Sequence, residues 1–194
     1  MLNFFKPRPY LHQYLNLPVD INLDLSTLNL SNLNEVLHVE IDPVRMVNQE
    51  FVEFINNIPG IRISFWEAFY TPPGKNLPIH CDYNKITDAV KLNISYGQKD
   101  SKIIWWKLKS GKSYNETSTA FSQNYLTADE NNCTILHSAF TNKPSLVQSG
   151  ILHSTYNPGP EGRWTLSLPL YEKNIATPIT FELAVAIFSN YLSF

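Results

Sequence analysis

The chain has 194 residues, of which 43% are hydrophobic and 16% are charged, and its formal net charge at pH 7 is -2. This composition is typical of a folded globular protein rather than a disordered one, and the length suits a single domain. The charge balance has no basic excess, and no run of Lys and Arg occurs, so nothing indicates a nucleic-acid-binding surface.

The two cysteines, Cys81 and Cys133, cannot form a disulfide framework and lack the CxxC spacing of a zinc site. The N-terminus has no uninterrupted apolar run followed by a small-residue cleavage site, and no stretch of about eighteen apolar residues occurs. We therefore expect a soluble, cytoplasmic protein with reduced thiols and no membrane partner.

The first part of the chain predicts one helix. Residues 17–40 place leucines among polar residues, which indicates short strands or loops packed on a core. In 42–60, Asp42 can cap a helix and Pro43 fits its first turn. Apolar residues then recur at helical spacing: Val44, Val47, Phe51, Ile55 and Ile58. We expect this helix to cover one side of a sheet.

From residue 61 onward the sequence is rich in β-branched and aromatic residues, which favour strands. Segments of strand length alternate with polar, Gly and Pro residues that favour turns. The predicted strands lie within residues 61–70, 77–82, 89–97, 101–110, 134–140, 145–157 and 163–171. Many short strands after one helix indicate an antiparallel sandwich or barrel with helices to one side.

Two later regions are less regular. Residues 110–133 are polar and weakly patterned, and a loop of this length in a compact domain is often a functional lid or partly disordered. The tail 179–194 is apolar and fits either a closing helix or a strand.

A His-x-Asp motif ends the predicted strand 77–82. Side chains two apart in a strand point to the same face, so His80 and Asp82 can reach one ion. An imidazole and a carboxylate suit a borderline divalent metal, and a site of two histidines and one carboxylate leaves coordination positions open. Cys81, between them, is expected to face away and pack in the core. Such a site needs a second histidine from a neighbouring strand.

His153 is the best candidate for that second histidine, because it lies near the end of an apolar strand that a Pro- and Gly-rich turn follows. We expect a hairpin there, which would place the next strand, with Arg163 and Thr165 on one face, beside it. An Arg side chain binds a carboxylate through two charge-assisted hydrogen bonds. A metal with open positions beside such a clamp implies a small carboxylic acid that chelates the metal.

The order His-x-Asp, a distant His and then Arg-x-Thr resembles the iron(II)- and 2-oxoglutarate-dependent dioxygenases. The resemblance implies that His80, Asp82 and His153 bind the metal, and that Arg163 and Thr165 hold the far carboxylate of 2-oxoglutarate. The approach YTPPGKNLPIHCD looks like the strand-turn-strand that leads into this motif in the aspartyl/asparaginyl and prolyl hydroxylases.

The resemblance covers residues 61–171 and implies a mainly β double-stranded β-helix, or jelly roll, as the catalytic core. We expect a single domain in which 1–60 adds flanking strands and a helix, and 172–194 packs against the core. The implied activity is an oxygenase that uses Fe(II) and 2-oxoglutarate to hydroxylate an amino-acid, peptidyl or small-molecule substrate. The sequence leaves the substrate and the oligomeric state open.

The predicted strand 89–97 supplies secondary candidates. Lys91, Asn93 and Ser95 alternate onto one face, and by the resemblance Asn93 is a candidate for contact with the cosubstrate or substrate. In the strand after it, Trp105 and Trp106 point to opposite faces. One of these tryptophans is expected in the core, and the other is a candidate for the wall of the site.

Three other interpretations stay open. A cupin-like protein could bind a metal or a carboxylate at this site without turnover. A structural protein could keep the fold with a decayed site, although all five matching positions are filled. His80 and Asp82 could also form a hydrogen-bonded pair in a turn without any metal.

Overall fold

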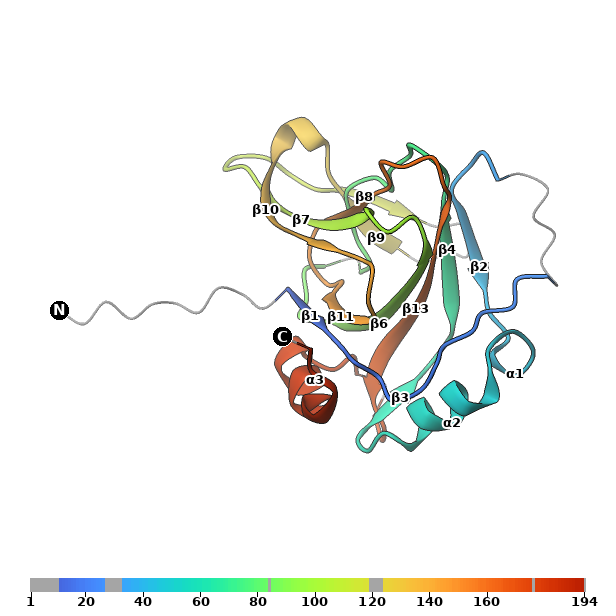
Figure 1. Ribbon diagram of the computed structural model, residues 1–194. Helices are drawn as coiled ribbons and strands as arrows, with labels where there is room; N and C mark the ends of the chain where they lie inside the picture. Colours follow the sequence, from blue (N-terminus) through green and yellow to red (C-terminus); the bar gives the residue numbers. More distant parts are fainter. Residues whose placement is uncertain (1–10, 27–32, 84, 119–123, 176, 194) are drawn as a thin grey trace.

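Two antiparallel β-sheets face each other in the computed structural model of the protein (Figure 1). The structure describes residues 11–26, 33–83, 85–118, 124–175 and 177–193. The expected mainly β, jelly-roll architecture is confirmed.

The larger sheet has the strand order β1-β11-β6-β13-β4-β2, and β3 pairs with the far end of β13. Its strands are β1 (His12–Tyr14), β11 (Ser145–Gln148), β6 (Val90–Gly97), β13 (Arg163–Glu172), β4 (Glu67–Thr71), β2 (Leu37–Glu40) and β3 (Ile61–Ile63). Every pairing in it is antiparallel.

The smaller sheet has the order β10-β7-β12-β5-β9-β8. Its strands are β10 (Cys133–Phe140), β7 (Lys102–Leu108), β12 (His153–Tyr156), β5 (His80–Cys81), β9 (Asn124–Thr127) and β8 (Asn115–Ser118). The expectation of a long loop over 110–133 was therefore wrong, because β8, β9 and the short 3-10 helix η1 (Glu130–Asn132) lie within it. Residues 119–123 of that loop lie outside the described residues.

Two predicted strands each divide into two. The segment 61–70 forms β3 and β4, which pair with successive parts of β13, and the three residues 64–66 oppose only two in β13. Such a bulge bends the strand and interrupts the ladder. The segment 145–157 forms β11 and β12, which belong to different sheets.

The helix predicted over 42–60 is also interrupted. Asp42 caps α1 (Pro43–Met46) as expected, and α2 (Gln49–Asn57) follows after a break. Val47 is extended at the break because it forms a bridge with Leu23. The expectation that Val44 faces the core was wrong, since it is 86% exposed.

The tail forms α3 (Phe181–Ile187) and the short 3-10 helix η2 (Ser189–Tyr191), which decides between the helix and the strand that the sequence left open. In Figure 1, α2 and α3 both lie on the lower side of the molecule, away from the smaller sheet. Within the described residues, no helix is both long and apolar enough to cross a membrane.

The main hydrophobic core lies on the outer face of the larger sheet rather than between the sheets. Leu92, Leu166 and Leu168 on that face belong to one buried cluster with Phe51 of α2 and Phe181 of α3. Alternate residues of the same strands point the other way, since successive side chains in a strand face opposite sides. The face between the sheets therefore receives the polar residues of β4, β6 and β13, and there the candidate site forms.

Candidate metal centre

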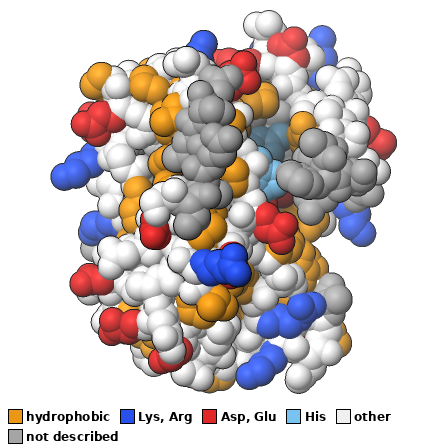
Figure 2. Space-filling view, turned by 90° about the vertical axis from the view of Figure 1, so that its right-hand side faces the viewer, with side chains coloured by type: hydrophobic (Ala, Val, Ile, Leu, Met, Phe, Trp, Pro, Cys, Tyr) orange, Lys and Arg blue, Asp and Glu red, His pale blue; other side chains and the backbone are white. Residues whose placement is uncertain are grey.

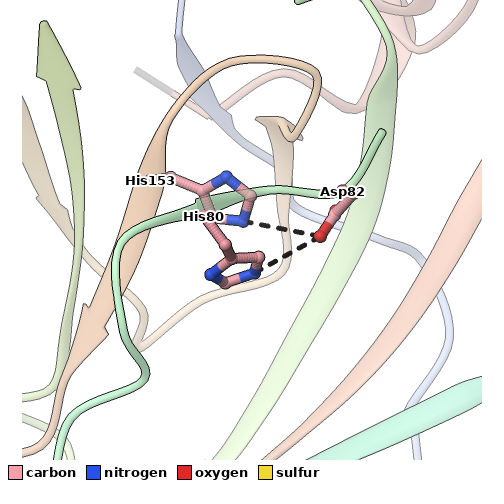
Figure 3. Close-up of side chains that lie close together, drawn as sticks. All are labelled: His80, Asp82 and His153. Carbon is pink, nitrogen blue, oxygen red and sulfur yellow. Dashed lines mark ion pairs between the residues drawn. The ribbon is translucent and has the colours of Figure 1, made fainter. Parts of the chain in front are cut away.

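Three side chains converge between the sheets (Figure 3). One ligand atom from each of His80, Asp82 and His153 lies within 4.8 Å of the others. The Asp82 Oδ1 atom is 3.3 Å from His80 Nε2 and 4.0 Å from His153 Nε2. The sequence motif thus predicted three residues that the fold does bring together.

Strand pairing accounts for this convergence. His80 of β5 is directly opposite His153 of β12, and their ring centroids are 4.4 Å apart. Asp82 follows β5 immediately, and its backbone N–H donates to the Ser149 carbonyl just after β11. Two neighbouring inner strands of the smaller sheet, β12 and β5, and the residue after β5 therefore present all three side chains to the space between the sheets.

The hydrogen bonds of the two imidazoles leave one nitrogen of each ring for a metal. His80 Nδ1 is 2.8 Å from the Pro78 carbonyl, and His153 Nδ1 is 2.9 Å from the Ile151 carbonyl. A carbonyl only accepts, so each Nδ1 carries the proton and each Nε2 presents a lone pair in the neutral ring. Two imidazole lone pairs and a carboxylate oxygen then face one another, an arrangement that suits a cation.

The protonation states agree with ligation. Burial, reinforced by the nearby His80, lowers the pKa of His153 to about 4, so this imidazole is neutral at pH 7. Burial by itself would raise the pKa of Asp82, but Lys91 and the two histidines together hold it well below its ordinary value. The centre therefore offers a carboxylate and a neutral imidazole as donors at pH 7.

An ion-pair chain that the motif did not reveal runs behind Asp82. Lys91 Nζ is 2.8 Å from Asp82 Oδ2 and 2.8 Å from Glu67 Oε1, and Glu67 Oε2 is 2.9 Å from His38 Nε2. Lys91 thus holds the Asp82 oxygen that faces away from the histidines. The only sequence signal for Glu67 was a lone acidic residue within the apolar segment SFWEAFY.

Arg163 is a further charged group between the sheets, and its side chain is fully buried. Its Nη2 donates to Ser95 Oγ at 3.1 Å, and its Nε has no hydrogen-bond partner among the described residues. Those residues also place no carboxylate within 4.0 Å of the guanidinium. Burial lowers the pKa of Arg163 to about 10, so a cation without an anionic partner persists there at pH 7.

Thr165 of β13 and Asn93 of β6 line the same cavity as this guanidinium. Thr165 Oγ1 is 3.1 Å from Ser95 Oγ, and Asn93 Oδ1 accepts from Ser167 Oγ at 2.9 Å. All four residues point to the space between the sheets, as the alternation in β6 and β13 requires.

The expected hairpin between the His153 and Arg163 strands was wrong. β12 pairs with β5 and β7 in the smaller sheet, whereas β13 pairs with β3, β4 and β6 in the larger sheet. The turn after β12 crosses from one sheet to the other, and Asn157 fixes it by donating to three backbone carbonyls. His153 and Arg163 therefore face each other across the sandwich.

The predictions for the tryptophans and for Cys81 had mixed outcomes. Trp105 is fully buried, as expected of one of the pair. Trp106 does not wall the site, because it lies on the other face of β7 and its Nε1 donates to Ser154 Oγ. Cys81 is buried in an apolar cluster and faces away from its two neighbours, as expected.

The metal-ligand candidates and Arg163 line one cavity, which we call the Arg163 cavity. Its wall includes Asn93, Ser149, Thr155, Thr165 and Ser167 together with His80, Asp82 and His153. In Figure 2, histidine side chains lie recessed in a hollow of the molecular surface. The arrangement can bind a divalent cation at one end of the cavity and an anionic group at the other.

Comparison with known proteins assigns no family. No protein-family model matches the chain, and no curated protein sequence matches it significantly. Solved structures show remote similarity. HygX from Streptomyces hygroscopicus, with nickel and 2-oxoglutarate bound, aligns at a TM-score of 0.42 and 11% identity over 74% of this chain and 72% of its own.

Two further structures are similar at the same low level. EvdO2 from Micromonospora carbonacea var. aurantiaca, complexed with 2-oxoglutarate, aligns at a TM-score of 0.39 and 10% identity over 74% of this chain and 71% of its own. Oxalate oxidase in complex with the substrate analogue glycolate aligns at 0.36 and 12% over 91% of each chain. At these values, function has to be argued from the residues of the site.

Proposed function

We propose that the protein is an iron(II)- and 2-oxoglutarate-dependent oxygenase that hydroxylates an amino-acid, peptidyl or small-molecule substrate. The observation that carries the proposal is the pairing of two features in one cavity. A His-Asp-His set brings three ligand atoms within 4.8 Å of one another, and a buried guanidinium in the same cavity has no anionic partner among the described residues. A dianion that chelates a metal at one end would satisfy both features.

The roles of the residues follow from their contacts. His80, Asp82 and His153 would hold Fe(II), with His80 and His153 oriented by their carbonyl partners and Asp82 by Lys91. Arg163 would pair with the far carboxylate of 2-oxoglutarate, and the hydroxyl of Thr165 would add a hydrogen bond. Asn93 is a weaker cosubstrate candidate, because its Oδ1 is already bonded to Ser167.

The bound metal would enable dioxygen to oxidise a substrate C–H bond, and 2-oxoglutarate would supply the electrons that the reaction also needs. The chain contributes binding, orientation and exclusion of water. Arg163 and Thr165 would fix one end of the cosubstrate, so that its keto acid end faces the three ligands. The buried polar wall would replace the hydration of the dianion with fixed donors.

The proposal predicts a visible absorption band when Fe(II) and 2-oxoglutarate are added to the protein without oxygen. Metal-to-ligand charge transfer arises only if the keto acid chelates the iron. We expect the band in the wild-type protein and its loss in Asp82→Ala and Arg163→Met. Asp100→Ala and Arg45→Met are matched controls at exposed positions away from the cavity, and both should keep the band.

The possible outcomes separate the alternatives. No band at saturating ligand, in a protein shown to be folded, would contradict the proposal. A band without any succinate formed after oxygen is admitted would favour a cupin-like protein that binds the carboxylate without turnover. A band that persists in Arg163→Met would show that 2-oxoglutarate binds in another way.

Arg163 also gives a prediction for stability. Replacing it with Met removes a buried charge for which the described part of the chain offers no anionic partner, so the ligand-free protein should become more stable by about 1–3 kcal/mol, while 2-oxoglutarate binding is lost. Urea denaturation of the metal-free protein measures the difference. A loss of stability in Arg163→Met would mean that the guanidinium has a stabilising partner in the folded protein.

A further inference from the structure

A second cavity adjoins the candidate metal centre on another side. It shares Phe69, Leu77, His80, Asp82 and Lys91 with the Arg163 cavity. Its own wall consists of Val36, His38, Glu67, Pro78 and Tyr125. We call it the Val36 cavity, after the residue at its exposed edge. A molecule in this cavity would contact the side chains of the metal centre without displacing a ligand from the Arg163 cavity.

The wall of the Val36 cavity is largely apolar and aromatic. Val36, Leu77, Pro78 and the rings of Phe69 and Tyr125 provide most of it. Two of the rings are held by neighbouring rings. Phe69 stacks on His38 with ring centroids 4.5 Å apart, and Tyr125 meets the His80 ring edge-on at 6.3 Å. The empty volume is about 740 Å³ with the open mouth included, which leaves room for a ring or a branched aliphatic group.

The charges on this wall are already paired with one another. Lys91 lies 2.8 Å from a carboxylate oxygen of each of Glu67 and Asp82, and His38 bonds the second oxygen of Glu67. A charged ligand in the cavity would lose its hydration without gaining an opposite charge among the described residues. An uncharged apolar ligand would lose nothing of this kind and would gain the contact with the aromatic wall.

The net charge around the metal centre also favours an uncharged ligand in the Val36 cavity. Glu67, Asp82 and Lys91 carry a net charge of about -1, and a divalent metal with one chelating carboxylate of 2-oxoglutarate adds about +1. The surroundings of the Val36 cavity are close to neutral once both metal and cosubstrate are bound.

We infer that the Val36 cavity is the subsite for the primary substrate and that it accepts an uncharged, apolar aliphatic or aromatic group. This inference rests on the proposed function, since it places a C–H bond of that group beside the metal. The specificity comes from Val36, Phe69, Leu77 and Tyr125, which form the apolar wall. The charges of Glu67, Lys91 and Asp82 are paired with one another, and their net charge of about -1 is balanced when the metal and 2-oxoglutarate are bound.

Three probes of one shape test the inference: benzyl alcohol, benzylamine and benzoate are neutral, cationic and anionic at pH 7. The protein is loaded with Mn(II) and 2-oxoglutarate, and the longitudinal relaxation of the ring protons of each probe is measured by NMR. A probe near the metal relaxes faster. We expect the increase in the relaxation rate of the ring protons to be at least about threefold larger for benzyl alcohol than for benzylamine or benzoate.

Substitutions at the cavity edge locate the effect. Val36→Trp should fill the cavity and remove the enhancement for benzyl alcohol, whereas Val44→Trp, at an exposed position on α1, should leave it unchanged. Val36→Glu adds a carboxylate to the wall and should raise the enhancement for benzylamine severalfold. Val44→Glu is its matched control.

The outcomes separate this inference from the proposed function. Equal enhancements for the three probes, or enhancements that Val36→Trp does not change, would overturn the inference while the anaerobic absorption band with Fe(II) still supports the proposed function. Absence of that band, together with no relaxation enhancement for any probe, would overturn both. A band that persists in Val36→Trp together with loss of the benzyl alcohol effect is the supporting result.

Discussion

At the scale of single residues, Lys91 is the group on which the candidate centre most depends. It is buried between two carboxylates, and burial would lower its pKa, but the charges of Asp82 and Glu67 raise the pKa instead. For Glu67 both effects have the opposite sign. Burial would raise its pKa, but Lys91 and His38 lower the pKa to below the ordinary value. Each buried charge in this series of ion pairs is therefore tolerated because an oppositely charged partner is present.

Lys91→Met should destabilise the metal-free protein by about 3 kcal/mol or more, because two buried carboxylates lose their shared cation. Adding Glu67→Gln to that variant should recover part of the loss, since it removes one of the two charges. Urea denaturation of the single and double variants measures both effects. Lys112→Met, at an exposed position, is the matched control. If Lys91→Met and Lys112→Met lower the free energy of unfolding equally, the prediction is refuted.

At the scale of elements, the start of β13 depends on its contact with the end of β6. Gly97 has a φ of +94° and pairs with Arg163, and a Cβ atom at Gly97 would overlap the carbonyl of Gly162. A side chain at this position therefore requires both an unfavourable backbone conformation and a shift of the chain that leads into β13. That shift would move the guanidinium proposed to hold 2-oxoglutarate.

Gly97→Ala should lower the free energy of unfolding by about 2 kcal/mol or more and weaken the anaerobic absorption band at a given 2-oxoglutarate concentration. Gly111→Ala is a matched control, because Gly111 also has a positive φ, of +75°, but nothing lies within 4 Å of its Cβ position. The control should cost only about 1 kcal/mol and keep the band. Similar effects of the two substitutions would mean that the contact with Gly162 is unimportant.

At the scale of the whole molecule, two histidines, the buried His153 and the half-buried His12, make stability depend on pH. Burial lowers the pKa of His153 to about 4, and burial with the nearby charge of His137 lowers the pKa of His12 to about 4. Each imidazole binds a proton near pH 6.5 in the unfolded chain but not in the folded protein until about pH 4. The unfolded state binds more protons between these values, so stability falls as the pH falls from 6.5 to 4.

We expect each of the two histidines to contribute at most about 3 kcal/mol to this loss. His12→Phe should reduce the dependence of the unfolding free energy on pH in this range by about half, because it removes one of the two titrating groups. Urea denaturation at several pH values, with EDTA present to exclude metal, measures the slope. Equal slopes for wild-type and His12→Phe proteins would contradict the assignment to His12.

Much of the fold followed from local pattern. The β-branched and aromatic segments after residue 61 gave most strands, because a half-buried strand favours those side chains. The breaks at Val47, within 61–70 and within 145–157 were missed, since each depends on a partner distant in sequence: Leu23, β13 and the two separate sheets. Propensity carries no information about such partners.

The sequence by itself determined which side chains could bind a metal and a carboxylate, because the order and spacing of His-x-Asp, His153 and Arg-x-Thr can be read directly from it. Only the tertiary structure decided that His153 and Arg163 face each other across two sheets, that Lys91 joins Asp82 to Glu67, and that a second, apolar cavity adjoins the centre. Spacing within a strand is fixed by the local backbone, but contacts across the sandwich are fixed by how the sheets pair and pack.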